Sequence, residues 1–253
     1  MRKFIEDLTI GAGKKLLRYF GKDSASIKRR SLAKQAASKY DKLIDNLIIE
    51  EIREFYPTHS ILTEESGFLK GNSKFLWIVD SLDGTGNFSN FNPFFCVCIA
   101  LMKGNELILG TIYAPAIDEF YLACKTKGAY FNHKKITVSN ISSLSKSYIL
   151  YCEGAEINKL RVRKILNRVY PKVVDLRKLG SAGLEIAWVA SGRYEAYFTT
   201  KIDPWDVAPG VLLVEEAGGK VTDFKGNFWE LKRKDVLFSN KKIHSQILNL
   251  IGS

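Results

Sequence analysis

Residues 75–88 read FLWIVDSLDGTGNF, and this stretch carries more structural information than any other in the chain. The apolar run FLWIV predicts a buried strand that ends at Asp80. Asp83 follows in a predicted loop, where Gly84 frees the backbone. At this spacing the two carboxylates can converge on a cation together with the Leu82 carbonyl. Because Asp-Gly is also an ordinary turn dipeptide, a metal loop and a plain turn remain equal alternatives for this stretch alone.

Two other acidic segments lie far from this stretch in the sequence. Upstream, Glu64 and Glu65 follow the strand-like run ILT. Adjacent side chains of an extended chain point to opposite faces, so only one of the two can enter a shared site. Downstream, IDPWDVAPG places Asp206 at the predicted N-cap of a helix, with Pro209 in its first turn. Taken one at a time, Glu64 and Glu65 could be solvated surface residues and Asp206 could be a helix cap. Their occurrence together with DSLDG favours one common site.

The composition is that of a globular protein. Of the 253 residues, 46% are apolar and 26% are charged, which predicts one or two domains and excludes wholesale disorder. No apolar run approaches the ~20 residues of a bilayer span. Acids interrupt the apolar residues of the N-terminal segment, as in an amphipathic helix and unlike a secretory signal. We therefore expect a soluble, cytoplasmic protein with no membrane partner.

Carboxylates are the most plentiful metal-binding side chains. The chain has four cysteines and three scattered histidines: Cys96, Cys98, Cys124, Cys152, His59, His133 and His244. No pair forms a CxxC motif, and the alternation in FFCVCIAL favours core positions for Cys96 and Cys98 over zinc binding or a disulfide. Without a histidine cluster, a metal here must be held by oxygen ligands, which suit Mg²⁺, Mn²⁺ or Ca²⁺.

The formal net charge is +11, with basic residues enriched at 28–39, 159–178 and 232–242. This surplus is compatible with attraction of anionic substrates or with binding to nucleic acid. A solvated, lysine-rich surface is the third interpretation. Because Tyr170 is the one aromatic residue of the 159–178 segment, base stacking has little support there, and nucleic acid is the weaker alternative as a partner.

Hydrophobic periodicity changes near residue 140. Helices are predicted near 3–20 and 40–55, followed by strand-like runs that indicate an antiparallel sheet: 60–66, 74–80, 94–104, 106–115, 119–132 and 135–139. Strands then alternate with helices predicted at 157–169, 181–191 and 207–217, which is typical of an α/β region. We therefore predict an N-terminal α+β subdomain over 1–140, a C-terminal α/β subdomain over 141–253, and a site between them.

Four motifs together resemble the inositol monophosphatase family. They are EES at 64–66, DSLDGT at 80–85, WDVAPG at 205–210 and EEAGG at 215–219, in family order and near family spacing over nearly the whole chain. The lysine and small residues of AASKYD are similar to those of the archaeal-type inositol monophosphatase/fructose-1,6-bisphosphatase branch. The resemblance implies an α+β fold, the layered αβαβα sandwich of inositol monophosphatases and fructose-1,6-bisphosphatases, and a homodimer.

The resemblance also implies a metal centre. Glu64, Asp80 and the Leu82 carbonyl would hold one Mg²⁺, and Asp80, Asp83 and Asp206 would hold a second. Two or three Mg²⁺ ions are expected, with Mn²⁺ as a substitute. The N-terminal subdomain would thus carry most of the metal ligands, and the C-terminal one would supply Asp206 and the substrate contacts.

By the same resemblance, Gly84 and Thr85 would offer backbone N–H groups to the phosphate. Thr85 would pair with Asp41 to orient and deprotonate the attacking water beside Glu64. Because the stretch before Asp41 lacks the DLVT run that is common there in the family, Asp45 remains a weaker candidate for the same role.

Six residues are expected on the substrate side: Asp83, Arg177, Gly180, Ser181, Ala182 and Thr199. Arg177 and Lys178 are candidates to bind a second phosphate, with solvated strand-end charges as the alternative. Thr199 stands where inositol-specific members often carry a glutamate, which argues against strict inositol specificity. Ser81 and Gly86 also depart from the family pattern, which usually has proline and Thr or Ser there.

The expected function is Mg²⁺-dependent hydrolysis of a phosphate monoester by a metal-activated water. Inositol monophosphate would be the substrate, together with fructose 1,6-bisphosphate in a dual enzyme. A 3′-phosphoadenosine 5′-phosphate or NADP phosphatase is the enzymatic alternative. An RNA- or protein-binding factor on the same fold is the alternative of another class.

Overall fold

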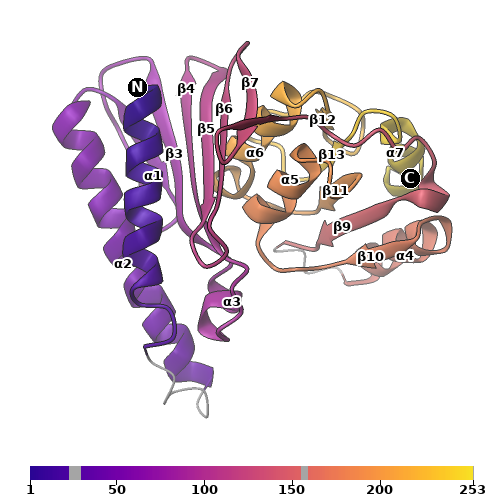
Figure 1. Ribbon diagram of the computed structural model, residues 1–253, viewed down its shortest axis with the longest axis horizontal. Coiled ribbons are helices and arrows are strands. Elements are labelled where there is room, and N and C mark those ends of the chain that lie inside the picture. Colours follow the sequence, from indigo (N-terminus) through magenta and orange to yellow (C-terminus); the bar gives the residue numbers. More distant parts are fainter. Residues whose placement is uncertain (23–29, 155–158, 253) are drawn as a thin grey trace.

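The computed structural model describes residues 1–22, 30–154 and 159–252. Its elements stack as helices, an eight-stranded sheet, helices, a five-stranded sheet and helices (Figure 1). The predicted αβαβα fold is therefore confirmed. Part of the basic segment 28–39 and the predicted start of a helix at 157 lie outside the described residues.

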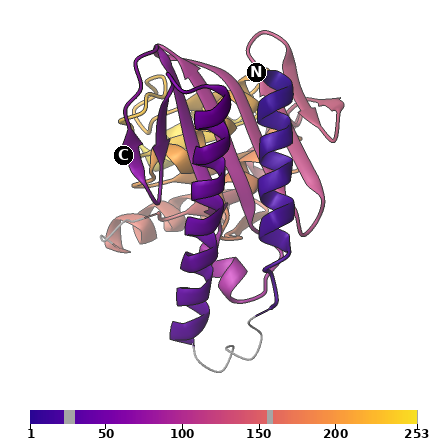
Figure 2. The same cartoon turned by 90° about the vertical axis from the view of Figure 1, so that its left-hand side faces the viewer.

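The first layer consists of α1 (Arg2–Leu17) and α2 (Arg30–Phe55), side by side on one face of the large sheet (Figure 2). Ile44, Ile48 and Ile52 are buried at helical spacing. Helix α2 begins at Arg30 rather than near residue 40, because the sequence from residue 30 to 40 contains no Gly or Pro that would end it.

The large sheet has the strand order β2-β1-β3-β4-β5-β6-β7-β8. Its strands are β1 (Ser60–Thr63), β2 (Gly67–Leu69), β3 (Phe75–Asp83), β4 (Cys96–Lys103), β5 (Glu106–Ala114), β6 (Glu119–Cys124), β7 (Gly128–Phe131) and β8 (Lys134–Ile136). All neighbours pair antiparallel as predicted, except that β1 is parallel to β3. The short strand β2 was not predicted.

The small sheet has the order β10-β9-β11-β13-β12. Its strands are β9 (Tyr148–Cys152), β10 (Asp175–Arg177), β11 (Ala196–Thr199), β12 (Lys220–Thr222) and β13 (Val236–Ser239). The helices α4 (Lys159–Val169) and α7 (His244–Ile251) form the outer layer on it (Figure 1). Strand β13 and helix α7 were not predicted.

Helices α5 (Ala182–Ala190) and α6 (Pro204–Glu216) lie between the two sheets. The largest hydrophobic cluster joins them to both sheets, so the two halves of the chain share a core. The chain passes from one sheet to the other between Ile136 and Tyr148, where the sequence pattern changes. A division into subdomains at residue 140 remains a prediction.

The N-terminus of α6 differs from the prediction. Asp203 is the N-cap, Pro204 is the first helical residue, and Asp206 belongs to the first turn with Pro209 inside the helix. Proline is well suited to the first helical position, where its fixed φ and missing N–H cost nothing, and this moves the start upstream. The assignment of Asp206 as the N-cap was therefore wrong.

None of the helices in the described segments combines the length and the apolar character that a bilayer crossing requires.

Candidate active site

Three acidic residues converge where β3 meets α6. The carboxylate oxygens of Asp80, Asp83 and Asp206 lie within 4.8 Å of one another. Asp80 and Asp83 are 1% and 6% exposed, respectively, and Asp206 is half-buried. The fold thus brings the 80–83 and 206 segments together, as we predicted from the acidic motifs.

An irregularity in β3 places both aspartates on one side of the sheet. Asp80 pairs with Cys98 and Asp83 pairs with Cys96. The partners in β3 are three residues apart, whereas those in β4 are two apart, so β3 contains one extra residue here. In a regular strand, residues three apart point to opposite faces. The prediction that β3 ends at Asp80 was wrong, because this irregular segment keeps its pairing as far as Asp83.

Asp80 has an unsatisfied oxygen at the centre of the cluster. Its Oδ1 accepts a hydrogen bond from the Leu82 N–H at 2.9 Å, whereas its buried Oδ2 has no hydrogen-bond partner among the described residues. Burial, followed by the charges of Asp83 and Asp206, raises the pKa of Asp80 well above its usual range. Because a buried carboxylate oxygen is costly without a partner, and Mg²⁺ prefers such ligands, the donor set fits a hard divalent cation.

Asp83 is bound to the N-terminus of α5. Its Oδ2 accepts hydrogen bonds from Ser181 Oγ at 2.6 Å, Gly183 N–H at 2.8 Å and Cys96 Sγ at 3.3 Å. Its Oδ1 accepts one from the Ala182 N–H at 3.1 Å. Burial raises the pKa of Asp83, and these hydrogen bonds oppose the rise. Ser181 and Ala182, which we expected on the substrate side, thus hold a predicted metal ligand.

Asp206 accepts a hydrogen bond from the Asp203 N–H at 3.1 Å in a capping box. Burial, followed by the charges of Asp83 and Glu64, raises the pKa of Asp206 well above its usual range. Helix α6 therefore fixes this carboxylate through its first turn and directs it toward β3.

Glu64 lies in the turn after β1, and the residue as a whole is exposed. Partial burial of its carboxyl group, then the charges of Glu65 and Asp83, raise its pKa to about 7. The Glu65 carboxylate lies 3.8 Å from Lys42 Nζ on α2. Glu64 is thus the better candidate of the two for a metal site.

Asp41 is held by Ser81 and not by Thr85. Ser81 Oγ donates to Asp41 Oδ1 at 2.5 Å, whereas Thr85 Oγ1 donates to the Leu82 carbonyl at 3.1 Å. The expected Thr85–Asp41 pair is replaced because Ser81 continues the alternation of Trp77 and Val79, which face the layer of α1 and α2. Sequence reasoning treated Ser81 only as a departure from the family pattern.

Burial raises the pKa of Asp41 to about 7; the Ser81 hydrogen bond opposes this rise, and the charges of nearby glutamates add to it. Asp45, the alternative candidate, accepts hydrogen bonds from Ser66 Oγ at 2.6 Å and Thr63 Oγ1 at 3.1 Å. Asp45 therefore ties the turn after β1 to α2, which leaves Asp41 as the better-placed catalytic candidate.

Gly84 begins the short helix α3 (Thr85–Ser89) at a φ of 89°. A Cβ atom there would lie 3.0 Å from the Phe94 carbonyl oxygen and 3.3 Å from that of Gly180. Asn87, which the sequence did not single out, ties the same segments, since its Nδ2 donates to the Phe94 and Leu179 carbonyls at 2.6 and 2.8 Å. The start of α3 and the Gly180 turn are therefore in direct contact.

The remaining substrate-side candidates already have partners or are buried. Arg177 Nε donates to Asp175 at 2.8 Å, and Lys178 Nζ donates to Glu153 at 2.6 Å. Thr199 is fully buried in β11, and its hydroxyl has no partner among the described residues. Its side chain therefore lies beneath the protein surface.

Glu185 supports this region from within α5 and was not found by sequence reasoning. Its Oε1 accepts a hydrogen bond from the Leu179 N–H at 2.8 Å. Burial raises the pKa of Glu185 to about 8. An acidic residue inside an apolar helix, AGLEIAWVA, is the signal that could have drawn attention to it.

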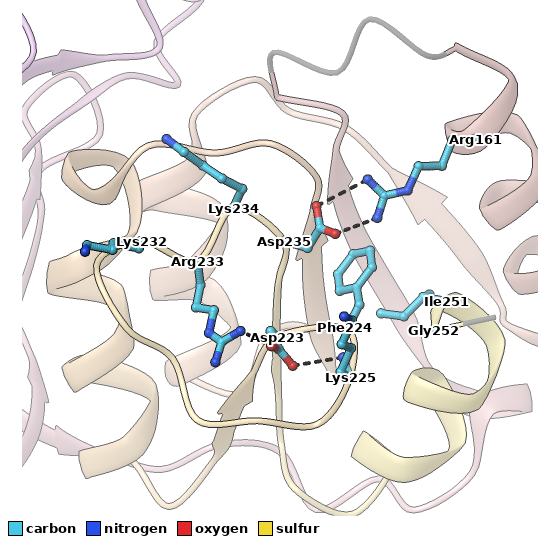
Figure 3. A pocket seen from close by; sticks show the side chains of 10 residues that line it. All are labelled: Arg161, Asp223, Phe224, Lys225, Lys232, Arg233, Lys234, Asp235, Ile251 and Gly252. Carbon is cyan, nitrogen blue, oxygen red and sulfur yellow. Dashed lines mark hydrogen bonds and ion pairs between the residues drawn. The ribbon is translucent and has the colours of Figure 1, made fainter.

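A separate basic pocket of about 460 Å³ is lined by residues of α4, of the 223–235 segment and of the end of α7 (Figure 3). Arg161 pairs with Asp235, and Arg233 pairs with Asp223 across it. Lys225, Lys232 and Lys234 also line it. None of the predicted site residues lines this pocket.

The layered fold with buried carboxylates between its sheets defines a protein of the inositol monophosphatase and fructose-1,6-bisphosphatase architecture. The chain belongs to the inositol monophosphatase family, whose model matches residues 1–253.

Individual relatives carry different names. A Thermotoga maritima protein named fructose-1,6-bisphosphatase/inositol-1-monophosphatase is 35% identical over 228 residues, covering 90% of this chain and 86% of that one. The Nus factor SuhB of Xylella fastidiosa is 37% identical over 217 residues, covering 85% and 78%. The structure of an Anabaena (Nostoc) inositol monophosphatase superposes with a TM-score of 0.86 at 32% identity, covering 99% of this chain and 94% of that one.

Proposed function

We propose that this protein is a Mg²⁺-dependent phosphatase that hydrolyses phosphate monoesters of small polyols, with inositol monophosphate as a substrate. The convergence of Asp80, Asp83 and Asp206 around an unpartnered, buried carboxylate oxygen carries the proposal. Membership of the inositol monophosphatase family supports it.

Glu64, Asp80, Asp83, Asp206 and the Leu82 carbonyl would hold two or three Mg²⁺ ions, with Mn²⁺ as a substitute. When bound, Mg²⁺ supplies positive charge to the phosphate and its leaving oxygen, and lowers the pKa of a bound water.

The chain's own residues would position the reactants. Asp41, fixed by Ser81, would accept a proton from the attacking water. The backbone N–H groups of Gly84 and Thr85, at the start of α3, would donate to phosphate oxygens.

Fructose 1,6-bisphosphate is the proposed second substrate. Its second phosphate requires a cation, and Arg177 and Lys178 are the candidates that the sequence offers. Because each already has an acidic partner, Asp175 or Glu153, the second phosphate must displace that partner. We therefore expect inositol monophosphate to be hydrolysed faster, with 3′-phosphoadenosine 5′-phosphate and NADP as the alternatives within the same reaction class.

Phosphate release from these four substrates, first with Mg²⁺ and then with EDTA, tests the proposal. We expect metal-dependent release with inositol 1-phosphate. Asp206→Asn should lower turnover at least 100-fold, which corresponds to about 3 kcal/mol of transition-state stabilisation, because the variant lacks a charged ligand. Release that persists in EDTA, or wild-type turnover in folded Asp206→Asn, would exclude the proposed metal centre.

A polyanion-binding role is the second candidate. The basic pocket in Figure 3 favours it, as does the similarity to proteins named Nus factor SuhB. Binding of a single-stranded RNA whose affinity falls steeply with salt, in protein that releases no phosphate from any of the four substrates, would favour this role over catalysis.

We further propose that the protein is a cytoplasmic homodimer, as the family resemblance implies. Light scattering coupled to size-exclusion chromatography tests the oligomeric state. A single species with the mass of one 28.6 kDa chain at micromolar concentration would contradict the dimer.

A further inference from the structure

Cys96 and Cys98 form a buried thiol pair next to Asp83. Both are free cysteines with no exposed surface, on the face of β4 that packs against the central helices. Cys96 Sγ lies 3.7 Å from Cys98 Sγ and 3.3 Å from Asp83 Oδ2. Ligand-type atoms of these three residues lie within 4.8 Å of one another. The proposed phosphatase chemistry uses neither thiol.

These separations are those of a tetrahedral thiolate site. Zn²⁺ bound by two thiolates at about 2.3 Å holds the sulfurs about 3.8 Å apart, and a carboxylate oxygen at about 2.0 Å lies about 3.5 Å from either sulfur. The observed Sγ–Sγ distance of 3.7 Å and the Cys96 Sγ–Asp83 Oδ2 distance of 3.3 Å are close to these values. The ligand atoms of Cys98 and Asp83 lie within 4.8 Å of each other, so a small side-chain movement completes the triangle. Ser181 Oγ lies 3.5 Å from Cys96 Sγ and 2.6 Å from Asp83 Oδ2, so it is a nearby oxygen that could complete the coordination.

A disulfide does not suit the pair. Same-face neighbours on a strand are two rises apart, about 6.6 Å, and their Cβ atoms point in parallel. A disulfide needs Cβ atoms about 3.5–4.5 Å apart. Burial raises the pKa of Cys96, and the hydrogen bond with Cys96 together with burial raises that of Cys98, so the thiols are protonated and weakly nucleophilic.

We propose that Cys96, Cys98 and Asp83 form a binding site for a thiophilic divalent cation of the Zn²⁺ class. Binding breaks two S–H bonds, forms two sulfur–metal bonds and releases two protons to solvent. Two thiolates, one carboxylate and the cation leave one net negative charge. The N-terminus of α5 favours that charge, because the N–H groups of Ala182 and Gly183 already point at Asp83.

Gly183 provides the space for this cluster. A Cβ atom at Gly183 would lie 2.3 Å from Cys98 Sγ and 3.1 Å from Cys96 Sγ. The backbone of α5 can therefore approach both sulfurs only because this residue has no side chain.

Asp83 belongs to both the thiol cluster and the carboxylate cluster. A thiophilic cation would draw Asp83 Oδ2 toward the sulfurs, and it would therefore weaken the Mg²⁺ centre and inhibit turnover. Only this consequence rests on the proposed function. The binding site itself stands on the thiol geometry.

The test is a Cd²⁺ titration of the whole protein in excess Mg²⁺, which occupies oxygen sites but does not compete for thiolates. Binding is followed by the ultraviolet charge-transfer absorption of thiolate–Cd²⁺ bonds, a signal that needs no enzymatic activity. We expect about one Cd²⁺ per chain, displacement by Zn²⁺, and loss of most of the absorption in Cys96→Ser and in Cys98→Ser.

Cys124→Ala and Cys152→Ala are the matched controls and should retain the full signal. Circular dichroism identifies which variants are folded, and two independent serine variants allow for the failure of one. Absence of thiolate absorption in the wild type, or full absorption in either folded serine variant, would overturn the proposal. Cd²⁺ binding without inhibition of an active phosphatase would leave the thiolate site standing and would contradict only the predicted weakening of the Mg²⁺ centre.

Discussion

Ser81 donates one short hydrogen bond to Asp41, and this bond fixes the carboxyl group that we propose as the catalytic base. The hydroxyl holds the carboxyl of Asp41 in α2 at the end of β3 that carries Asp80 and Asp83, close enough for the charges of Asp41 and Asp80 to interact. Ser81 therefore couples the irregular segment of β3 to α2. A proline at this position would have no hydroxyl to donate, so Asp41 is oriented here by a group that the usual family residue lacks.

Ser81→Ala should lower kcat about tenfold with little change in KM, because Asp41 loses the donor that fixes it; this corresponds to about 1.4 kcal/mol. Steady-state kinetics with inositol 1-phosphate at saturating Mg²⁺ measure the effect.

Ser81→Thr keeps the hydroxyl and should recover much of the rate. A wild-type kcat in folded Ser81→Ala would show that Asp41 needs no such positioning.

The co-occurrence of the acidic segments favoured one common site, and the resemblance to the inositol monophosphatase family selected Asp80, Asp83 and Asp206 as its metal ligands. Neither could reveal the partners of those acids. The hydrogen bond from Cys96 to Asp83 depends on the register between β3 and β4, and that from Ser181 depends on how α5 docks. Both are tertiary properties with no local signal in the sequence.

Helix α6 packs between the sheets through residues without side chains. A Cβ atom at Gly210 would lie 2.5 Å from Ile186 Cγ2 on α5, and one at Gly110 on β5 would lie 2.8 Å from the Pro209 carbonyl oxygen. The close approach brings α6 near β3, and hence Asp206 near Asp80. Packing of the central layer thus determines the geometry of the acidic cluster.

Gly210→Ala should destabilise the protein by about 1–3 kcal/mol, because the added methyl group overlaps Ile186 in a filled core. Gly11→Ala is the control. Gly11 is exposed on α1, and an added Cβ atom would meet no described atom within 4 Å, so alanine there should stabilise by up to about 1 kcal/mol.

Urea denaturation of both variants measures these changes. Equal effects of the two substitutions would mean that the α5–α6 contact is not close-packed.

Long elements with strong periodicity, such as β3 to β6, could be predicted from the sequence. The elements that were missed altogether are short, whereas α2, β3 and α6 were predicted with a wrong boundary. Strand β13 reads VLFS and follows a run of basic residues, and α7 is short, so neither has enough turns or alternations to be recognised. Tertiary pairing with β11 and packing against β13 stabilise them instead.

Across the whole molecule, the two sheets meet around a concentration of negative charge inside a protein of net charge +11. Asp41 and Glu64 have pKa values raised to about 7, and Asp80 and Asp206 are raised well above their usual range. Without a cation, the folded state thus retains protons that the unfolded chain releases near pH 4. Folding, metal binding and proton release should therefore be coupled.

The sign of this coupling predicts how stability depends on pH. A carboxyl whose pKa is raised on folding stabilises the metal-free protein fully below its ordinary pKa, and this contribution is lost as pH rises through the folded value of about 7 for Asp41 and Glu64. In EDTA, Tm should fall by several degrees between about pH 5 and pH 8. Mg²⁺ binds the ionised carboxylates, so its stabilising effect should be small at pH 5 and large at pH 8.

Differential scanning calorimetry with and without Mg²⁺ across this range measures both trends. Asp80→Asn should raise Tm in EDTA at pH 8, because the variant lacks a carboxyl group whose ionisation the folded protein disfavours, and should abolish most of the Mg²⁺ effect. A Mg²⁺-induced rise in Tm that is the same at pH 5 and pH 8, or that persists in Asp80→Asn, would contradict the coupling. Either result would mean that the stabilising ion binds outside the carboxylate cluster, because proton release from that cluster must accompany any cation bound within it.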